Sequence, residues 1–171
     1  MKFVCLGNTG DKYKHTRHNV GKKFGEFLCQ KLETRNSKFE NSGRIVELEN
    51  GWRVIFLDCL MNNSGPCLRQ LLKITSHKPL VPSRLWVVHD DMDISFGEFK
   101  IQKDRGAAGH KGVESVINAL GTKDFGRIRI GIGRPPKNIP PENFVLMPFN
   151  QEEREKLEQV FNNILKNLKK M

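Results

Sequence analysis

Short apolar segments alternate with longer amphipathic segments along this chain, and few architectures accommodate that order. Six segments have the length and composition of β-strands: Lys2–Leu6, Arg44–Leu48, Trp52–Leu57, Leu85–Val88, Phe99–Gln102 and Ile128–Ile132. Apolar residues recur at helical spacing in four others: Val20–Leu32, Cys67–Leu72, Val113–Leu120 and Leu157–Leu168. The 171 residues suffice for one domain with its own core. We therefore predict an α/β fold in which residues 1–171 form a single domain, with helices flanking a mixed β-sheet.

Turn signals separate these segments. Asn50-Gly51 joins two of the predicted strands and is a strong hairpin signal. Ser64 stands where it can cap the helix that follows, and the polar segment Lys38–Gly43 predicts a loop. Gly106–Gly112 precedes another predicted helix, so its backbone amides can bind a phosphate. This segment lacks the P-loop pattern, which argues against a nucleoside triphosphatase.

The chain is strongly basic, with a net charge of +10 and a pI of about 9.6. Four cations, at positions 14, 17, 22 and 23, surround His18 near the start of the first predicted helix. A second basic group follows later in the chain: Lys100, Lys103, Arg105, Arg127, Arg129 and Arg134. Two such groups favour a long polyanion such as nucleic acid as the partner. The alternative is a basic protein without a polyanionic partner.

Neither a membrane span nor a disulfide framework is expected. No stretch approaches the roughly 18 apolar residues of a transmembrane helix. The first residues, 1–11, are predicted to begin with a strand and not to serve as a signal peptide. The cysteines lack CxxC spacing; they are Cys5, Cys29, Cys59 and Cys67. We expect reduced, buried thiols in a cytoplasmic protein, in preference to disulfides or a zinc site.

Polar residues follow three of the predicted strands: Asn8 after the first, Asn62 after the third, and His89–Asp93 after the fourth. Ligands of open α/β sheets bind outside the carboxyl ends of the strands, so we expect these residues to line one crevice together with His18. Asp90 offers a carboxylate that can orient the His18 ring. Alternatively, the acidic run binds a metal ion with His89 or His110.

Four stretches of the chain, in the same order, resemble the bacterial-type peptidyl-tRNA hydrolases. They are Leu6–Gly10 with Tyr13 and Thr16–Gly21, Met61–Gly65, Val88–Asp93, and Gly109–Gly112 through Arg127–Pro135. The resemblance covers most of the chain to about Pro135. It implies a single α/β globule with a twisted mixed sheet, and a monomer.

The resemblance also implies roles for individual residues. His18 is expected to be the catalytic base and Asp90 its orienting carboxylate. The expected substrate-binding residues are Asn8, Tyr13, Asn62 and Lys111, and the expected tRNA phosphate-binding residues are Lys100, Lys103 and Arg129. The chain departs from the family pattern at Thr9, where proline is usual, in the loop Asp104–Gly109, and at two expected functional positions. Lys111 stands where the family has asparagine, and Gln102 replaces a second clamp lysine, with Lys103 adjacent.

The implied reaction is hydrolysis of the ester between a peptide and the 3′-terminal ribose of tRNA, whose acceptor arm and 3′ CCA end are the expected partner. A neutral imidazole, with a pKa of about 6.5, suits the activation of water. The resemblance implies no metal and no nucleotide cofactor. Ser64 and Cys67 lie outside any nucleophile-elbow pattern, so direct attack by water is predicted. The rival hypotheses are a noncatalytic RNA-binding protein of the same fold and a metal-dependent hydrolase.

Overall fold

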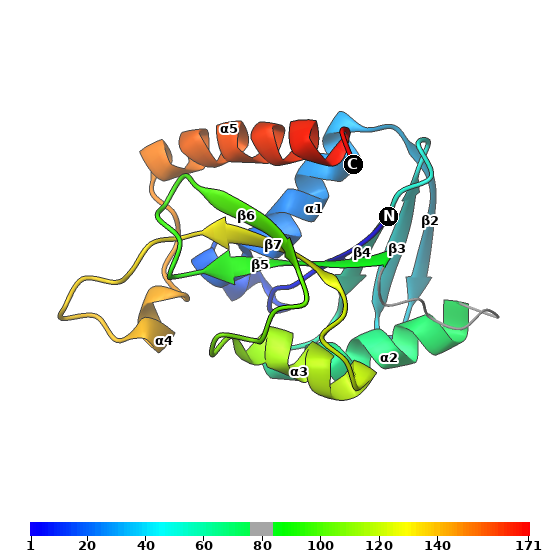
Figure 1. The fold of residues 1–171 in the computed structure, drawn as a ribbon, viewed down its shortest axis with the longest axis horizontal. Helices are drawn as coiled ribbons and strands as arrows, with labels where there is room; N and C mark the ends of the chain where they lie inside the picture. The colour runs from blue at the N-terminus through cyan, green and yellow to red at the C-terminus, as the bar shows by residue number, and fades with distance from the viewer. Residues whose placement is uncertain (76–83) are drawn as a thin grey trace.

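The computed structural model describes residues 1–75 and 84–171. Within them the chain forms a seven-stranded sheet of order β2-β3-β4-β1-β5-β7-β6 (Figure 1). The strands are β1 (Lys2–Cys5), β2 (Thr34–Glu40), β3 (Gly43–Leu48), β4 (Arg53–Leu57), β5 (Leu85–Asp91), β6 (Phe99–Lys103) and β7 (Gly126–Gly131). The helices are α1 (Val20–Lys31), α2 (Ser64–Thr75), α3 (Lys111–Leu120), α4 (Pro141–Phe144) and α5 (Gln151–Leu168). None of the helices in these two ranges is long and apolar enough to cross a membrane.

The sheet is mixed, as predicted. Its central strands β4, β1, β5 and β7 run parallel to one another. β3 is antiparallel to both β2 and β4, and β6 is antiparallel to β7. The predicted Asn50-Gly51 hairpin is confirmed, because this dipeptide joins β3 to β4. The carboxyl ends of the parallel strands therefore share one edge of the sheet, where ligands bind in folds of this kind.

Helices cover both faces of the sheet: α1 and α5 on one face, α2 and α3 on the other (Figure 1). Residues 3–6, in β1 and directly after it, alternate between the two cores. Phe3 and Cys5 belong to the cluster that includes α1 and α5, whereas Val4 and Leu6 pack on the side of α2 and α3. The central strands are thus buried on both faces, and the polar side chains that can meet a ligand gather at the strand ends.

The loop predicted over Lys38–Gly43 is reduced to a turn at residues 41–42, because its first residues belong to a strand. Thr34–Glu40 forms β2, an edge strand that pairs antiparallel with β3. Nearly all its side chains are exposed, so no alternation of apolar and polar residues marks it in the sequence. Backbone pairing with β3 supplies its structure, which side-chain pattern does not reveal.

Two predicted boundaries near the strand ends also differ from the structure. Ser64 does not cap α2 from outside; it is the first helical residue, and its hydroxyl donates to the Met61 carbonyl at 2.7 Å. His89, Asp90 and Asp91 do not follow the strand but end it, because β5 extends to Asp91. Charged residues are rare in strands that are buried on both faces. The prediction, which relied on apolar residues, therefore ended this strand at Val88.

Candidate active site

His18 and Asp90 form a hydrogen-bonded pair. His18 lies in the 3-10 turn η2 (Arg17–Asn19), just before α1, and Asp90 lies near the end of β5. His18 Nδ1 is 2.9 Å from Asp90 Oδ1 and 3.0 Å from Asp90 Oδ2. The backbone N–H of His18 donates to the Val145 carbonyl at 2.8 Å, which fixes the turn. Asp90 is only 3% exposed, whereas 15% of the His18 side chain is exposed. A buried carboxylate therefore holds a ring that reaches the surface.

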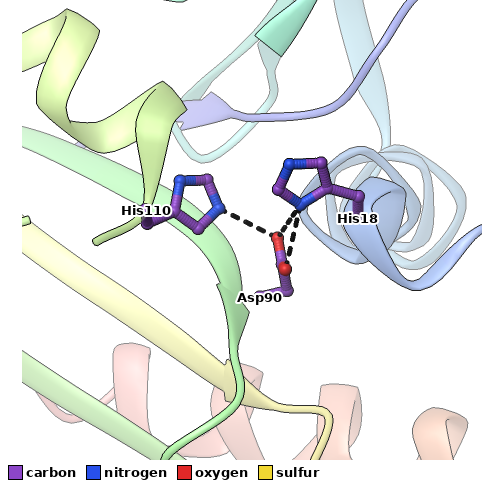
Figure 2. Close-up of side chains that lie close together, drawn as sticks. All are labelled: His18, Asp90 and His110. Carbon is purple, nitrogen blue, oxygen red and sulfur yellow. Dashed lines mark hydrogen bonds and ion pairs between the residues drawn. The ribbon is translucent and has the colours of Figure 1, made fainter. Parts of the chain in front are cut away.

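His110 contacts the same carboxylate from the other side. Its Nε2 lies 3.0 Å from Asp90 Oδ1, and its Nδ1 accepts the Val113 backbone N–H at 3.2 Å, which caps α3. Because Nδ1 accepts, the proton of a neutral His110 sits on Nε2, and the ring donates to Asp90. Figure 2 shows the His18 and His110 rings on either side of the carboxylate.

The same reasoning assigns the His18 tautomer. An ionised carboxylate only accepts hydrogen bonds, so His18 Nδ1 carries the proton and Nε2 keeps its lone pair. In Figure 2 this second nitrogen points away from Asp90. A neutral imidazole with one nitrogen held by a carboxylate and the other free is suited to take a proton from water.

Local charges support these protonation states. Burial raises the pKa of Asp90, but His110 and His18 lower it by more, so the pKa of this carboxyl lies well below its ordinary range. Burial and the neighbouring His110 hold the pKa of His89 well below 6.5. His89 Nδ1 donates to the Asp90 backbone carbonyl at 2.7 Å. Near neutral pH, Asp90 is therefore ionised and His89 is neutral.

Asn8 is held firmly beside this pair. Its Oδ1 accepts the Met61 backbone N–H at 2.7 Å. The Asn19 side chain makes two bonds to the Asn8 backbone, accepting from its N–H at 2.8 Å and donating to its carbonyl at 2.9 Å. With Oδ1 occupied, the free side of the Asn8 amide is its NH₂ group, a donor with no acceptor among the residues that the structure describes.

These side chains line one cavity of about 820 Å³. Its walls include the residues expected to act on or bind the substrate: Asn8, Tyr13, His18, Asn62, Asp90 and Lys111. Leu60 and Leu146 add apolar surface to the same walls and are 52% and 43% exposed. A volume of this size, with a few polar groups among apolar ones, fits a small ligand or the end of a larger one. The structure thus brings these six residues together, while their roles stay predictions.

The three predicted phosphate-binding residues do not form one group. Lys100 is opposite Arg129 in the β6–β7 register, so both extend from the same face of the sheet. Arg129 is already paired, since its Nε donates to Asp91 at 2.7 Å and one terminal nitrogen donates to Gln102 at 3.0 Å. Lys103 extends from the other face of β6, with its amine 5.8 Å from the centroid of the Trp86 ring.

The first basic cluster is also only partly available to a ligand. Arg17 is 7% exposed and donates to Glu153 at 2.6 and 2.9 Å and to the Pro148 carbonyl. It ties η2 to α5 and is therefore structural. Lys22 donates to the Thr9 hydroxyl at 3.1 Å. The sequence alone did not show that Arg17 is buried and paired, because its partner Glu153 lies 136 residues away in the chain.

A metal ion has one candidate group of ligands in the described ranges. Suitable atoms of His18, Asp90 and His110 all lie within 4.8 Å of one another. The ring nitrogens of His18 and His110 that face Asp90 already donate N–H hydrogen bonds to its carboxylate. The other nitrogen of His110, Nδ1, accepts the Val113 backbone N–H. The acidic run proposed from the sequence does not converge, because Asp91 pairs with Arg129 and Asp93 pairs with Arg134. The geometry therefore fits acid–base chemistry better than metal binding.

The fold and the site together define an α/β protein in which a buried carboxylate orients a histidine at the edge of the sheet. The chain belongs to the peptidyl-tRNA hydrolase family, whose model matches residues 2–171. Peptidyl-tRNA hydrolases of Mycobacterium avium (strain 104) and Hydrogenobaculum sp. (strain Y04AAS1) are 41% and 40% identical to it. These matches cover 90% and 88% of this chain and 81% and 79% of the relatives.

A solved structure agrees with this assignment. The crystal structure of peptidyl-tRNA hydrolase from Acinetobacter baumannii superposes with a TM-score of 0.87 at 26% sequence identity, over 98% of this chain and 86% of that one. The family predicted from the sequence, the fold and the enzyme class are confirmed. Hydrolysis of peptidyl-tRNA is the activity that membership of this family assigns.

Proposed function

We propose that His18 is the general base of peptidyl-tRNA hydrolysis in this enzyme. The observation that carries this proposal is the pairing of His18 Nδ1 with Asp90 at 2.9 Å, which leaves Nε2 free beside the cavity. Nε2 takes a proton from water as the water attacks the ester carbonyl carbon. Asp90 holds the tautomer and stabilises the imidazolium that forms. His110 donates to Asp90 and so positions the carboxylate.

We propose that the polar side chains of the cavity wall bind the ester and the peptide end. The Met61 backbone N–H fixes the Asn8 amide through its Oδ1, and the Asn19 side chain holds the Asn8 backbone. The NH₂ group of Asn8 is thus a fixed donor that can stabilise the oxygen that becomes negative during attack. Asn62, Tyr13 and Lys111 line the same cavity and supply further donors to the peptide or the ribose. These contacts involve no cofactor.

Recognition of the tRNA is assigned to the basic surface beside this cavity. Lys100 and Arg129 face the same side of β6 and β7. They lie two strands and one strand from His89, or roughly 10 and 5 Å at the usual strand spacing. A phosphate of the acceptor arm can therefore bind here while the 3′ CCA end reaches His18. Lys103, on the opposite face, lies outside this clamp.

We further propose that the enzyme works as a monomer in the cytoplasm. Every residue assigned to the site comes from one chain, so no second copy is needed to complete it. The four cysteines are free, which suits a reducing compartment. Size-exclusion chromatography with light scattering tests the oligomeric state.

Hydrolysis of an N-acetylated aminoacyl-tRNA, with and without a chelator, tests the mechanism. His18→Ala should lower kcat by roughly 10²–10⁴, the usual contribution of a general base, with little change in tRNA affinity. His15→Ala is the matched control, because His15 is an exposed histidine of the same segment. Near-parental turnover by folded His18→Ala contradicts the proposal. Loss of activity with chelator alone supports the metal-dependent alternative, and tRNA binding without turnover supports the noncatalytic one.

A further inference from the structure

Two cysteines lie together behind the loop that carries Asn62. Cys59 follows β4, and Cys67 lies in the first turn of α2. Their thiols form a hydrogen bond with each other. The Cys67 thiol also donates to the Ser42 carbonyl at 2.9 Å, and the Asp58 backbone N–H donates to the same carbonyl at 3.0 Å. These contacts hold two nucleophilic side chains against each other, outside the cavity that contains His18.

The two thiols differ in character. The hydrogen bond from Cys59 and the nearby Lys22 lower the pKa of Cys67 more than burial raises it, and the result is about 7. The hydrogen bond to Cys67 and burial raise the pKa of Cys59. Near neutral pH the Cys67 thiol therefore ionises in a fraction of the molecules, while Cys59 stays a thiol. A thiolate next to a second thiol is the arrangement that reacts with an oxidant and then closes a disulfide.

The pair is connected to the active site through the backbone. The Cys59 carbonyl accepts the Thr9 N–H at 3.1 Å, and two residues later the Met61 N–H donates to Asn8 Oδ1 at 2.7 Å. Asn62 follows directly in the 3-10 turn η3 (Met61–Asn63). A shift of Cys59 is therefore transmitted to both asparagines of the cavity wall.

We propose that Cys59 and Cys67 are a redox-active pair that hydrogen peroxide converts to a disulfide, and that this bond lowers hydrolase activity by displacing the Asn8 and Asn62 loops. Cys67 is 8% exposed and Cys59 is half-buried. A small oxidant such as peroxide can reach such a pair more readily than a bulky disulfide can.

The chemistry balances in two steps. The Cys67 thiolate attacks one peroxide oxygen, the O–O bond breaks, and Cys67 becomes a sulfenic acid while hydroxide leaves and is protonated to water. The Cys59 sulfur then attacks the sulfenic sulfur, the S–S bond forms and the S–O bond breaks. The departing hydroxide takes the Cys59 proton and leaves as a second water. Two thiols lose two electrons in total, and one peroxide is reduced to two waters.

The disulfide changes the geometry of the loop. It needs a sulfur separation of about 2.05 Å, much less than that of two hydrogen-bonded thiols. Cys59 therefore moves toward α2, and residues 60–66 are enclosed in a covalent ring. We expect this movement to lengthen the Thr9–Cys59 hydrogen bond, the Asn8–Met61 hydrogen bond, or both. Small displacements of positioning groups commonly reduce rates by 10- to 100-fold, so we expect about a tenfold or greater loss of kcat/KM.

Peptide mapping tests bond formation without reference to activity. The folded enzyme is treated with hydrogen peroxide, remaining thiols are blocked with N-ethylmaleimide, and the digest is analysed by mass spectrometry. A linked peptide pair containing Cys59 and Cys67, absent after dithiothreitol, is the expected result. Oxidised protein in which Cys59 and Cys67 are not joined to each other overturns the proposal, whether or not the assigned catalytic residues prove correct.

Activity measurements test the consequence. Peroxide should lower kcat/KM for N-acetylated aminoacyl-tRNA in the parent enzyme, and dithiothreitol should restore it. Cys59→Ser should have parental activity before treatment and cannot form the disulfide. Any activity that this variant loses in peroxide should therefore not be restored by dithiothreitol. Cys29→Ser is the matched control, because Cys29 is a half-buried cysteine on α1; it should respond like the parent. Unchanged kcat/KM in fully cross-linked enzyme, or equal reversible loss in Cys59→Ser, overturns the proposed effect.

Discussion

At the scale of single residues, the Asp90 carboxylate determines the tautomers of two imidazoles. His110 must donate through Nε2 because Val113 occupies its Nδ1. His18 must donate through Nδ1, which leaves Nε2 as the base. Only a group with acceptors on both sides can serve both rings, and a carboxylate meets this requirement. The choice of aspartate is therefore as important to the proposed mechanism as the choice of histidine.

Asp90→Asn should reverse the His18 tautomer. An amide has one acceptor and one donor group, so it cannot accept from both rings. Since His110 is committed by Val113, the amide oxygen faces His110, and its NH₂ group faces His18 Nδ1. His18 then carries its proton on Nε2, where it cannot take one from water. We expect kcat to fall by roughly 10²–10⁴ with a much smaller change in KM.

Steady-state kinetics on N-acetylated aminoacyl-tRNA measures this effect. Asp93→Asn is the matched control, since Asp93 lines the same cavity but pairs with Arg134 on the surface. It should keep near-parental kcat. Parental turnover by Asp90→Asn would show that the pair does not act as described.

Lys111 stands where the resemblance implies asparagine, and we expect it to act in binding. Lysine offers three donors and no acceptor, so it cannot replace an accepting asparagine, but its charge can bind a phosphate or a developing anion beside α3. Lys111→Ala should therefore raise KM for peptidyl-tRNA more than it lowers kcat, and more so at low salt than at high salt. Lys111→Asn should remain active.

A salt series on both Lys111 variants provides the measurement. Exposed charges lose most of their long-range effect above about 0.1 M salt, where the Debye length is about 10 Å. The KM difference between Lys111→Ala and the parent should shrink as salt increases. A salt-independent collapse of kcat with unchanged KM would instead assign Lys111 to the chemical step.

The placement of the site residues was partly predictable from the sequence. His18 and Asp90 stand in recognisable motifs at predicted strand and helix ends, so their proximity was expected. His110 was considered only as a metal ligand, because its two hydrogen bonds depend on where α3 begins relative to β5. Arg17 was grouped with surface cations, because Glu153 lies 136 residues away in the chain. Long-range partners of this kind leave no local signal.

At the scale of elements, β5 connects the two parts of the site. Successive residues of a strand point to opposite faces. Asp90 contacts His18, and the next residue, Asp91, accepts from Arg129 on β7 at 2.7 Å. The register pairs Asp91 with Gly131 and Lys100 with Arg129, so the proposed phosphate clamp is built into the same sheet as Asp90, the partner of the proposed base. The distance between chemistry and tRNA recognition is thus fixed by strand pairing.

Neutralising the clamp should weaken tRNA binding without changing the chemistry. Lys100→Ala and Arg129→Gln should each reduce the slope of log affinity against log salt by about one phosphate contact. Lys103→Ala is the matched control, an exposed lysine on the same strand but the other face, and it should change the slope less. A short N-acyl-aminoacyl ester without tRNA phosphates should be cleaved almost normally by all three variants. Equal losses on both substrates would indicate damage to the fold.

Element prediction succeeded where side chains carry a pattern. The strands with apolar residues and the four long helices were identified. Burial of one face makes apolar residues recur about every two residues in a strand and about every 3.6 residues in a helix. β2 was missed, because an exposed edge strand is held by its backbone partners. The end of β5 was missed, because a functional site replaces apolar residues there with charged ones.

At the scale of the whole molecule, covering both sheet faces places several polar side chains in the interior. His89 is 2% exposed, and its Nε2 has no hydrogen-bond partner among the residues that the structure describes. Protonation of His89 would place a positive charge in the interior, beside His110 and Arg127. The cost of this burial and repulsion exceeds the attraction of Asp90 for the charge. His89 therefore stays neutral in the folded state at pH values where the unfolded chain is protonated.

This difference predicts that stability falls with acidification between about pH 6.5 and 5. The unfolded His89 binds a proton below a pKa of about 6.5, whereas the folded one does not, so protonation favours unfolding. The free energy of unfolding should decrease by up to about 1.4 kcal/mol per pH unit from this group alone. Asp90 acts in a lower range, because its depressed pKa contributes stability that is lost only as pH falls below about 4.

Urea unfolding at a series of pH values from 7.5 to 5 gives the free energy of unfolding as a function of pH. The slope of this free energy against pH, and not its absolute value, tests the prediction. His89→Asn keeps a donor near Nδ1 but has no group that titrates in this range, so the free energy of unfolding should depend on pH less steeply than in the parent. The variant can be less stable at every pH and still test the prediction, because a packing loss is independent of pH. His15→Asn, a substitution at an exposed histidine, should retain nearly the parental slope. If His89→Asn keeps the full parental slope, the loss of stability at acid pH arises from other groups and not from the buried histidine.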